Sequence, residues 1–292
     1  RATRAERRAA EEAAAAREVS QFLVGLFKVS DPSEARGNVV TARELLDRGA
    51  ERSAIDLSRQ PDLQSRMTQT IGTAYASLGL YQEARTQLER ALATRRRTLD
   101  PNDPAIAETE ISLGDVMADH GEIEEAERHL QAALAIDQKA LGPRDQHLSS
   151  AIASMAALRF RQGRNSEAEK LYTNALAIDE VADNPDERVL ARHLVGAGAV
   201  LWAQNRFADA ERSMRRGLAI QERRLPQDDP ELASTLSNLG GVEWSLGRYQ
   251  DALPLYERAR SMFEKTLDPD HPNMASVLNN LAETYWKLKR YR

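Results

Sequence analysis

Small and apolar residues recur along this chain with a period of 42 residues, as from Ala210 to Ala252. Stretch 231–272 shows the unit clearly, because Leu236, Leu239 and Gly240 have the i, i+3, i+4 spacing of one helix face. Steps of the same length place small residues at Gly72, Gly114, Ala156, Gly198 and Ala282. A second series of the same period comprises Ala42, Ala84, Ala126, Ala168, Ala210 and Ala252. The chain is therefore predicted to be a repeat array.

Each repeat divides into two helical patterns, called here the first and the second helix. Gly247 follows the first pattern, at a place where a helix end favours a left-handed residue. The second pattern includes Ala252 and Tyr256, and Pro272 is well placed to begin the next helix. Small residues such as Gly240 and Ala252 are expected to let the two helices of a pair approach closely.

The pattern predicts an all-α fold, a right-handed α-α superhelix of about thirteen helices without a strand. The predicted organisation is a long N-terminal linker and capping helix at 1–28, a degenerate first repeat at 29–62, five 42-residue units at 63–271, and the first helix of a truncated further repeat at 272–292. The degenerate repeat is recognised because its second helix keeps the residues expected at the repeat positions. The connection at 181–187 departs from the pattern and is predicted to be the loosest.

The repeat resembles the tetratricopeptide repeat, whose consensus carries W-x2-L-G-x2-Y followed by A-x3-F. The matching residues here are Leu239-Gly240, Ala252-x3-Tyr256, Ala259, Pro272 and Leu281-Ala282-x2-Tyr285. The longer unit, with its L-D-P-D-H-P link, looks like the repeats of kinesin light chains and of many bacterial proteins. This resemblance covers 63–292 and implies a scaffold that binds proteins or peptides.

Residues 17–52 look like the stretch that joins a membrane helix to tetratricopeptide repeats in a class of bacterial serine/threonine protein kinases. That resemblance implies a single-pass parent protein in which the repeats are the sensor or docking region. A kinase needs cytoplasmic ATP, which would place the repeats outside, whereas the Arg-rich start of this chain favours the inside. The alternative is a self-association scaffold or an adaptor region of another bacterial signalling protein, such as a signalling ATPase. Self-association would use the N-terminal helix or the exposed last helix.

The amino-acid composition argues against several classes of partner and chemistry. A net charge of −5 argues against a surface dedicated to nucleic acid. The chain has no cysteine, so it has no thiol chemistry. No apolar run approaches the ~18 residues that a membrane span needs, so we expect a soluble fragment without direct membrane insertion.

Catalytic motifs are missing from the sequence. It has no Gly-rich kinase loop, no H-R-D and no D-F-G. The five histidines lack metal-ligand spacing and are interpreted as helix-end or surface residues: His120, His129, His147, His193 and His271. The sequence predicts no catalytic residue, no metal and no cofactor, and hence no enzyme in this chain.

The candidate binding residues lie on the predicted first helices. One position, repeated at steps of 42, holds the aromatic ladder: Phe160, Trp202, Trp244 and Trp286. These rings either form the floor of a groove, where tryptophan is common at binding hot spots, or pack in the core.

Two asparagines and three cations complete the predicted groove. Asn238 and Asn280 correspond to the asparagines that hold the backbone of an extended peptide in kinesin light chains. An amide suits that role because it offers both a donor and an acceptor; the alternative is that both are solvated polar residues. Arg161, Arg192 and Lys287 add positive charge, which predicts a preference for acidic segments.

Overall fold

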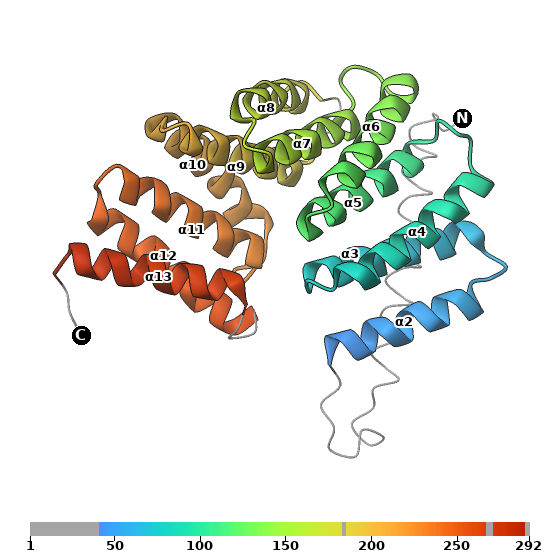
Figure 1. The fold of residues 1–292 in the computed structure, drawn as a ribbon, viewed down its shortest axis with the longest axis horizontal. Helices are drawn as coiled ribbons and strands as arrows, with labels where there is room; N and C mark the ends of the chain where they lie inside the picture. Colours follow the sequence, from blue (N-terminus) through green and yellow to red (C-terminus); the bar gives the residue numbers. More distant parts are fainter. Residues whose placement is uncertain (1–40, 183–184, 267–270, 290–292) are drawn as a thin grey trace, which may run out of the picture. The chain divides into compact units, whose positions relative to one another are not determined.

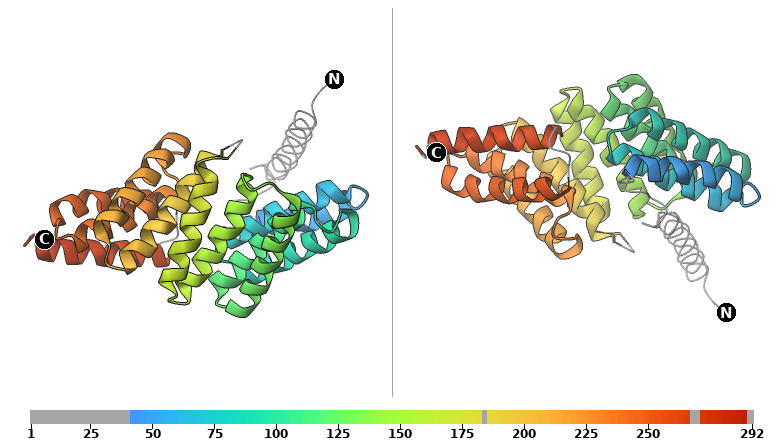
Figure 2. Two further views of the ribbon diagram at one scale, coloured as in Figure 1. Left: turned by 90° about the horizontal axis from the view of Figure 1, so that it is seen from above. Right: turned by 90° about the horizontal axis from the view of Figure 1, so that it is seen from below.

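The computed structural model describes residues 41–182, 185–266 and 271–289. Within these ranges the protein is all-helical, as predicted, with twelve helices and no strand. Figures 1 and 2 show the helices following one another as antiparallel hairpins. The predicted N-terminal helix at 1–28 lies outside the described residues. The chain divides into two compact units, which are residues 1–141 and 142–292.

The described part of unit 1 contains two complete helix pairs and one preceding helix. Its helices are α2 (Ala42–Asp56), α3 (Pro61–Ser77), α4 (Tyr81–Thr98), α5 (Pro104–His120) and α6 (Ile123–Ala140). The pairs are α3 with α4 and α5 with α6, and α2 packs against α3. By repeat position α2 is a second helix, because Ala42 corresponds to Ala84 of α4.

In the described residues of unit 2 there are three pairs and one following helix. Its helices are α7 (Gln146–Arg161), α8 (Asn165–Asp179), α9 (Glu187–Ala203), α10 (Phe207–Arg224), α11 (Pro230–Ser245), α12 (Tyr249–Thr266) and α13 (Pro272–Lys287). Successive first helices α7, α9, α11 and α13 also contact one another. Helix α8 has 15 residues, whereas α10 and α12 have 18 each. The connection predicted to be loosest follows α8, and its residues 183–184 lie outside the described part.

The helix boundaries follow from local chemistry. The side chains of Asp103, Asp145, Asp186 and Asp229 each accept a backbone N–H at the start of a first helix. As predicted, Gly247 ends α11 with a left-handed backbone, at φ +76°. That conformation carries no steric penalty for glycine, so the chain reverses there at little cost.

The alanine series lies at the closest approach within each pair. Its buried members have no exposed surface: Ala84, Ala126, Ala168, Ala210 and Ala252. In the α5–α6 pair, a methyl group on Gly114 would lie 2.6 Å from Leu130 Cγ. The two helices therefore pack around small residues, as the sequence predicted.

Replacing Ala126 or Ala168 by leucine should lower the free energy of unfolding by about 1–3 kcal/mol, because the added carbons have no space between the paired helices. Urea denaturation followed by circular dichroism measures this loss. Ala135→Leu is the control, since Ala135 is exposed on α6. Unchanged midpoints for Ala126→Leu and Ala168→Leu would show that the repeat register is wrong.

Candidate functional site

The aromatic ladder lies where neighbouring first helices of unit 2 meet. Trp202, in the last turn of α9, is partly buried, and its Nε1 donates a hydrogen bond of 2.9 Å to Ser245 Oγ on α11. Its ring packs against Gly241, where a Cβ would lie 2.5 Å from the ring edge. Trp202 thus joins α9 to α11 and remains partly accessible.

Trp244 has the same position one repeat later, but its surroundings differ. The residue of α13 that corresponds to Ser245 is Lys287. An ammonium group only donates, so it cannot replace the serine acceptor. Trp244 Nε1 is buried and has no hydrogen-bond partner among the described residues. Lys287 Nζ instead lies 5.8 Å from the centroid of the Trp244 ring, within the range of a cation–π interaction.

The last member of the ladder is open to solvent. Trp286 is 61% exposed, and Lys287 Nζ lies 5.1 Å from its ring centroid. Tyr249 adds a third ring, at 5.9 Å from the same ammonium group and edge-on to Trp244 at 5.7 Å. Phe160, in α7, is partly buried. The structure therefore brings Trp244, Trp286 and Lys287 into one cluster.

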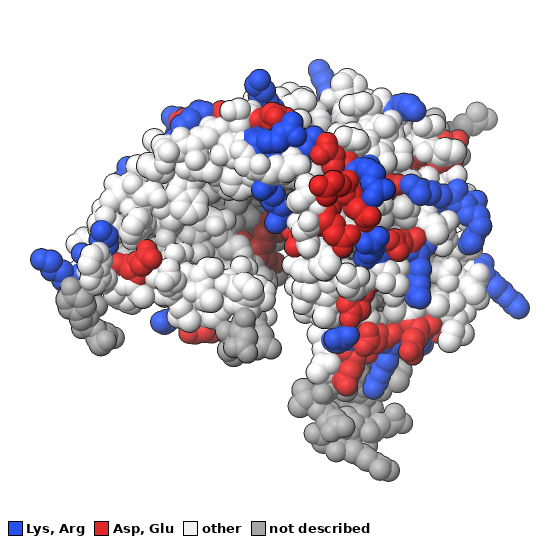
Figure 3. Space-filling model, viewed as in Figure 1, with Lys and Arg blue, Asp and Glu red and all other residues white. Residues whose placement is uncertain are grey.

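The two asparagines of the predicted groove are both partly accessible. Asn238 and Asn280 are partly buried, and neither side-chain amide is hydrogen-bonded to another described residue. Asn238 and Ser245 are two helical turns apart on α11, and Asn280 and Lys287 are equally spaced on α13. We call the face that carries these four residues the first-helix face. Figure 3 shows that the visible surface over α11 and α13 is largely uncharged.

The two arginines are not part of this cluster. Arg161 is exposed at the last residue of α7. Arg192 is exposed near the start of α9, about 15 Å along the helix from Trp202. Burial raises the pKa of the Glu231 carboxyl, and the charge of Arg192 opposes that rise. The charge of Arg192 therefore influences the N-terminal ends of α9 and α11.

Buried polar clusters between successive helices were missed by the sequence prediction. Asp179, at the end of α8, is fully buried and accepts from Ser149 Oγ at 2.5 Å. Its other carboxylate oxygen lies 2.6 Å from His193 Nδ1. The interpretation of His193 as a helix-end or surface residue is wrong: it is 7% exposed within α9, since Asp179 supplies a buried hydrogen-bond partner.

Two further observations concern metal binding and membrane insertion. Among the described residues no group of His, Asp and Glu side chains suits a metal ion. The described helices also include none with the length and apolar character of a membrane span.

The spacing and packing of these helices agree with a comparison against protein families. The tetratricopeptide repeat profile matches residues 64–139, 148–223 and 231–292, which is more than half of the chain. The chain belongs to the tetratricopeptide repeat family. Tetratricopeptide repeat proteins are typically non-catalytic scaffolds, and their surfaces suit the binding of proteins or peptides.

Solved structures share this fold at low sequence identity. BtubC (BKLC) from P. vanneervenii is 18% identical with a TM-score of 0.57, covering 80% of this chain and 96% of its own. A Rap protein complexed with Competence and Sporulation Factor is 15% identical with a TM-score of 0.63, covering 94% and 87%. A putative kinesin light chain repeat protein of Podospora anserina is 22% identical with a TM-score of 0.51, covering 69% and 95%. The search of curated proteins gave no match.

Proposed function

We propose that unit 2 binds an extended, acidic segment of a partner protein along the first-helix face of α11 and α13. The observation that carries this proposal is the buried indole N–H of Trp244, which has no acceptor within the described ranges and lies beside the exposed Lys287. A carboxylate of the guest supplies the missing acceptor and pairs with the ammonium group.

The energetics favour such a guest. A buried donor without an acceptor costs about 1–3 kcal/mol, which a bound carboxylate recovers. Lys287 has a flexible stem, so it can turn from the Trp244 ring toward the guest and expose Nε1. The amides of Asn238 and Asn280 offer a donor and an acceptor each to the guest backbone. The exposed ring of Trp286 supplies apolar area at the end of this face.

A structural relative gives general support. The Rap protein of similar fold was solved in complex with Competence and Sporulation Factor. A repeat array of this fold can therefore hold a partner. At 15% identity the likeness concerns the fold alone, so the carboxylate preference rests on Trp244 and Lys287.

The cellular role we propose is that of the sensor or docking region of a bacterial membrane-bound serine/threonine protein kinase. Its support is the resemblance of residues 17–52, of which 17–40 lie outside the described part. Sequencing the gene upstream of Arg1 tests it. An apolar span of about 20 residues preceded by kinase loops is expected. An upstream region without kinase loops would refute this role and leave the peptide-binding proposal standing.

Self-association is the competing function, and one observation favours it. Leu278 and Trp286 of α13 are 47% and 61% exposed. Exposed apolar side chains on one helix suit a contact between two copies. Sedimentation velocity across a range of protein concentrations decides this point, because a dimer through α13 would dissociate in a Leu278→Lys variant.

The carboxylate preference predicts a specific effect of Lys287→Ser. This change restores the serine found one repeat earlier, so Trp244 gains an internal acceptor and the guest loses its ion pair. We expect binding of a short labelled peptide of alternating aspartate and alanine to weaken about tenfold or more. Fluorescence polarisation measures the affinity, and the indole N–H signal of Trp244 in a nitrogen-15 spectrum reports the hydrogen bond.

Two controls accompany this experiment. Lys170→Ser removes the same charge from an exposed site on α8 and should leave binding unchanged. The asparagine counterpart of the peptide should bind much more weakly than the aspartate peptide. Equal binding of both peptides to the native protein would contradict the carboxylate preference.

A further inference from the structure

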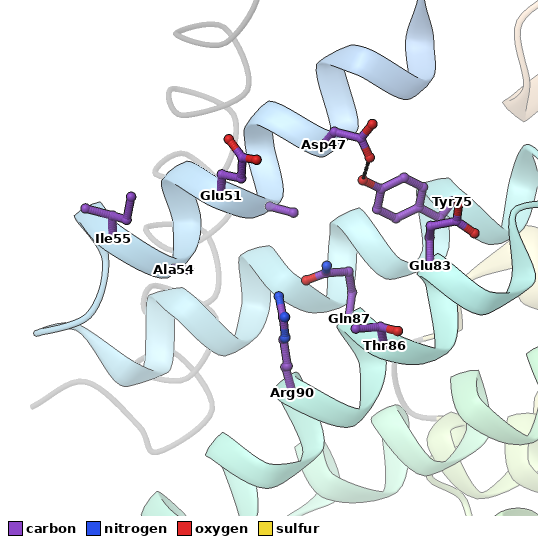
Figure 4. Close-up of a pocket in the computed structure, with 10 residues that line it drawn as sticks. Asp47, Glu51, Ala54, Ile55, Tyr75, Glu83, Thr86, Gln87 and Arg90 are labelled. Atoms are coloured by element: carbon purple, nitrogen blue, oxygen red, sulfur yellow. Dashed lines mark hydrogen bonds between the residues drawn. The ribbon is translucent and has the colours of Figure 1, made fainter.

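A separate pocket of about 600 Å³ lies in unit 1, between the second helices α2 and α4. Figure 4 shows the two helices facing each other across it, with Tyr75 of α3 at one end. Ala50 and Ala54 of α2 line one side, and Gln87 of α4 lines the other. The pocket is far from the aromatic ladder in sequence and shares no residue with it.

The pocket exists because two side chains are short. Ala50 corresponds to Leu92 one repeat later, and Leu92 is 5% exposed. Ala54 corresponds to Arg96, whose guanidinium donates a hydrogen bond of 2.5 Å to the buried Glu110. Where α2 has two alanines, the next repeat has a buried leucine and an arginine that is 58% exposed, so the space between α2 and α4 is left open here.

At the same place, Gln87 lacks the hydrogen-bond partner that the corresponding residue has one repeat later. Gln87 is 8% exposed, and its side-chain amide has no hydrogen bond to the described part of the chain. One repeat later the corresponding residue is His129, which contacts Glu110 at 2.6 Å. The residue of α3 that corresponds to Glu110 is Thr68. In Figure 4 the amide of Gln87 points into the pocket, where a ligand can reach it.

The charges around the pocket favour a cation. Three carboxylates line it, from Asp47, Glu51 and Glu83. Asp47 accepts the hydroxyl of Tyr75 at 2.6 Å, and burial followed by this bond raises the pKa of Tyr75. Glu83 pairs with Arg43 at 2.5 Å, whereas Glu51 is exposed and has no ion pair with another described residue.

We propose that this pocket binds an arginine side chain of a partner protein, in the place that Arg96 fills one repeat later. The methylene stem lies over Ala50 and Ala54, and the guanidinium donates to Gln87 Oε1, while the carboxylate of Glu51 on the α2 side supplies negative charge. Guanidinium is planar and has five donors, so it bonds the amide oxygen and keeps donors free for solvent or a carboxylate. Arg90 also lines the pocket and repels a cation, but its side chain is exposed and can turn into solvent.

Titration of the whole protein with N-acetyl-arginine amide tests this proposal, with the side-chain amide signal of Gln87 in a nitrogen-15 spectrum as the readout. N-acetyl-citrulline amide is the matched neutral probe. We expect arginine to shift the Gln87 signal and to bind about tenfold more tightly than citrulline, because hydrogen bonds from a charged donor are stronger. Arg90→Ala should strengthen arginine binding.

Variants separate the pocket from general charge effects. Ala50→Leu and Ala54→Arg fill the space with the side chains found one repeat later, so each should abolish binding while the protein stays folded by circular dichroism. Ala93→Arg adds the same charge at an exposed site on α4 and should preserve binding. Retained binding in Ala50→Leu, equal binding of citrulline, or an unshifted Gln87 signal would each overturn the proposal. None of these variants alters α11 or α13, so the outcome is independent of the acidic-peptide proposal for unit 2.

Discussion

Asp179→Ala should lower the free energy of unfolding by about 2–4 kcal/mol, because it removes the acceptor of buried donors at about 1–3 kcal/mol each. His193 Nδ1 loses its contact of 2.6 Å, in a position with 7% exposure. Ser149 Oγ loses one partner but keeps the Gln146 carbonyl at 2.8 Å. The histidine therefore accounts for most of the expected loss. Urea denaturation followed by circular dichroism measures it.

A matched control and a second variant make this prediction specific. Asp251→Ala removes an exposed carboxylate from α12 and should change stability by about 0.5 kcal/mol or less. The double replacement Asp179→Leu with His193→Leu should be less destabilising than Asp179→Ala, since it leaves no buried polar group unpaired. A stability of Asp179→Ala equal to that of the Asp251→Ala control would contradict the role of this cluster.

The helix pairs could be predicted because each depends on a short-range rule. A small residue is required at the crossing of each pair, and at Gly114 not even a methyl group fits beside Leu130. The helix ends depend on single residues, such as Asp229 and Gly247. Repetition at steps of 42 makes these weak local signals unambiguous.

The buried polar clusters could not be predicted from the repeat pattern, because their chemistry changes from repeat to repeat. Arg95 donates to Thr109 at 2.7 Å, and Asp179 contacts His193 at the same separation in sequence. The corresponding residues of the last repeat, Phe263 and Val277, are buried and apolar. The sequence does carry a signal for these clusters, because the two corresponding positions change together from one repeat to the next.

The candidate sites were only partly visible in the sequence. The aromatic ladder was found from the repeat positions, but its packing depends on the next first helix, where Ser245 satisfies Trp202 and Lys287 leaves Trp244 unsatisfied. The pocket beside Gln87 was missed. Its signal in the sequence is Ala50, which stands where the next repeat has a leucine, but this change also weakens the helical pattern of α2 and therefore indicates only a degenerate repeat.

Trp202→Ala should lower the free energy of unfolding by about 2–4 kcal/mol, less than a fully buried aromatic ring but more than a surface side chain. The variant loses the packing on Gly241 and the hydrogen bond to Ser245. Trp286→Ala, at the same repeat position but 61% exposed, should change stability by about 0.5 kcal/mol or less. Thermal and urea denaturation of both variants measure this difference.

The loss of affinity for the acidic peptide should be larger in Trp286→Ala than in Trp202→Ala, the reverse of their effects on stability. The reason is that Trp286 and Trp244 lie at the proposed site, whereas Trp202 joins α9 to α11. Trp286→Ala should weaken binding at full stability, at a cost of about 2 kcal/mol if the ring is an anchor. Trp202→Phe keeps an apolar ring and should cost only about 1 kcal/mol of stability for the lost hydrogen bond. If Trp286→Ala binds the peptide as the native protein does, the exposed ring makes no contribution to recognition. If Trp202→Ala is as stable as Trp286→Ala, the ring does not hold the two first helices together.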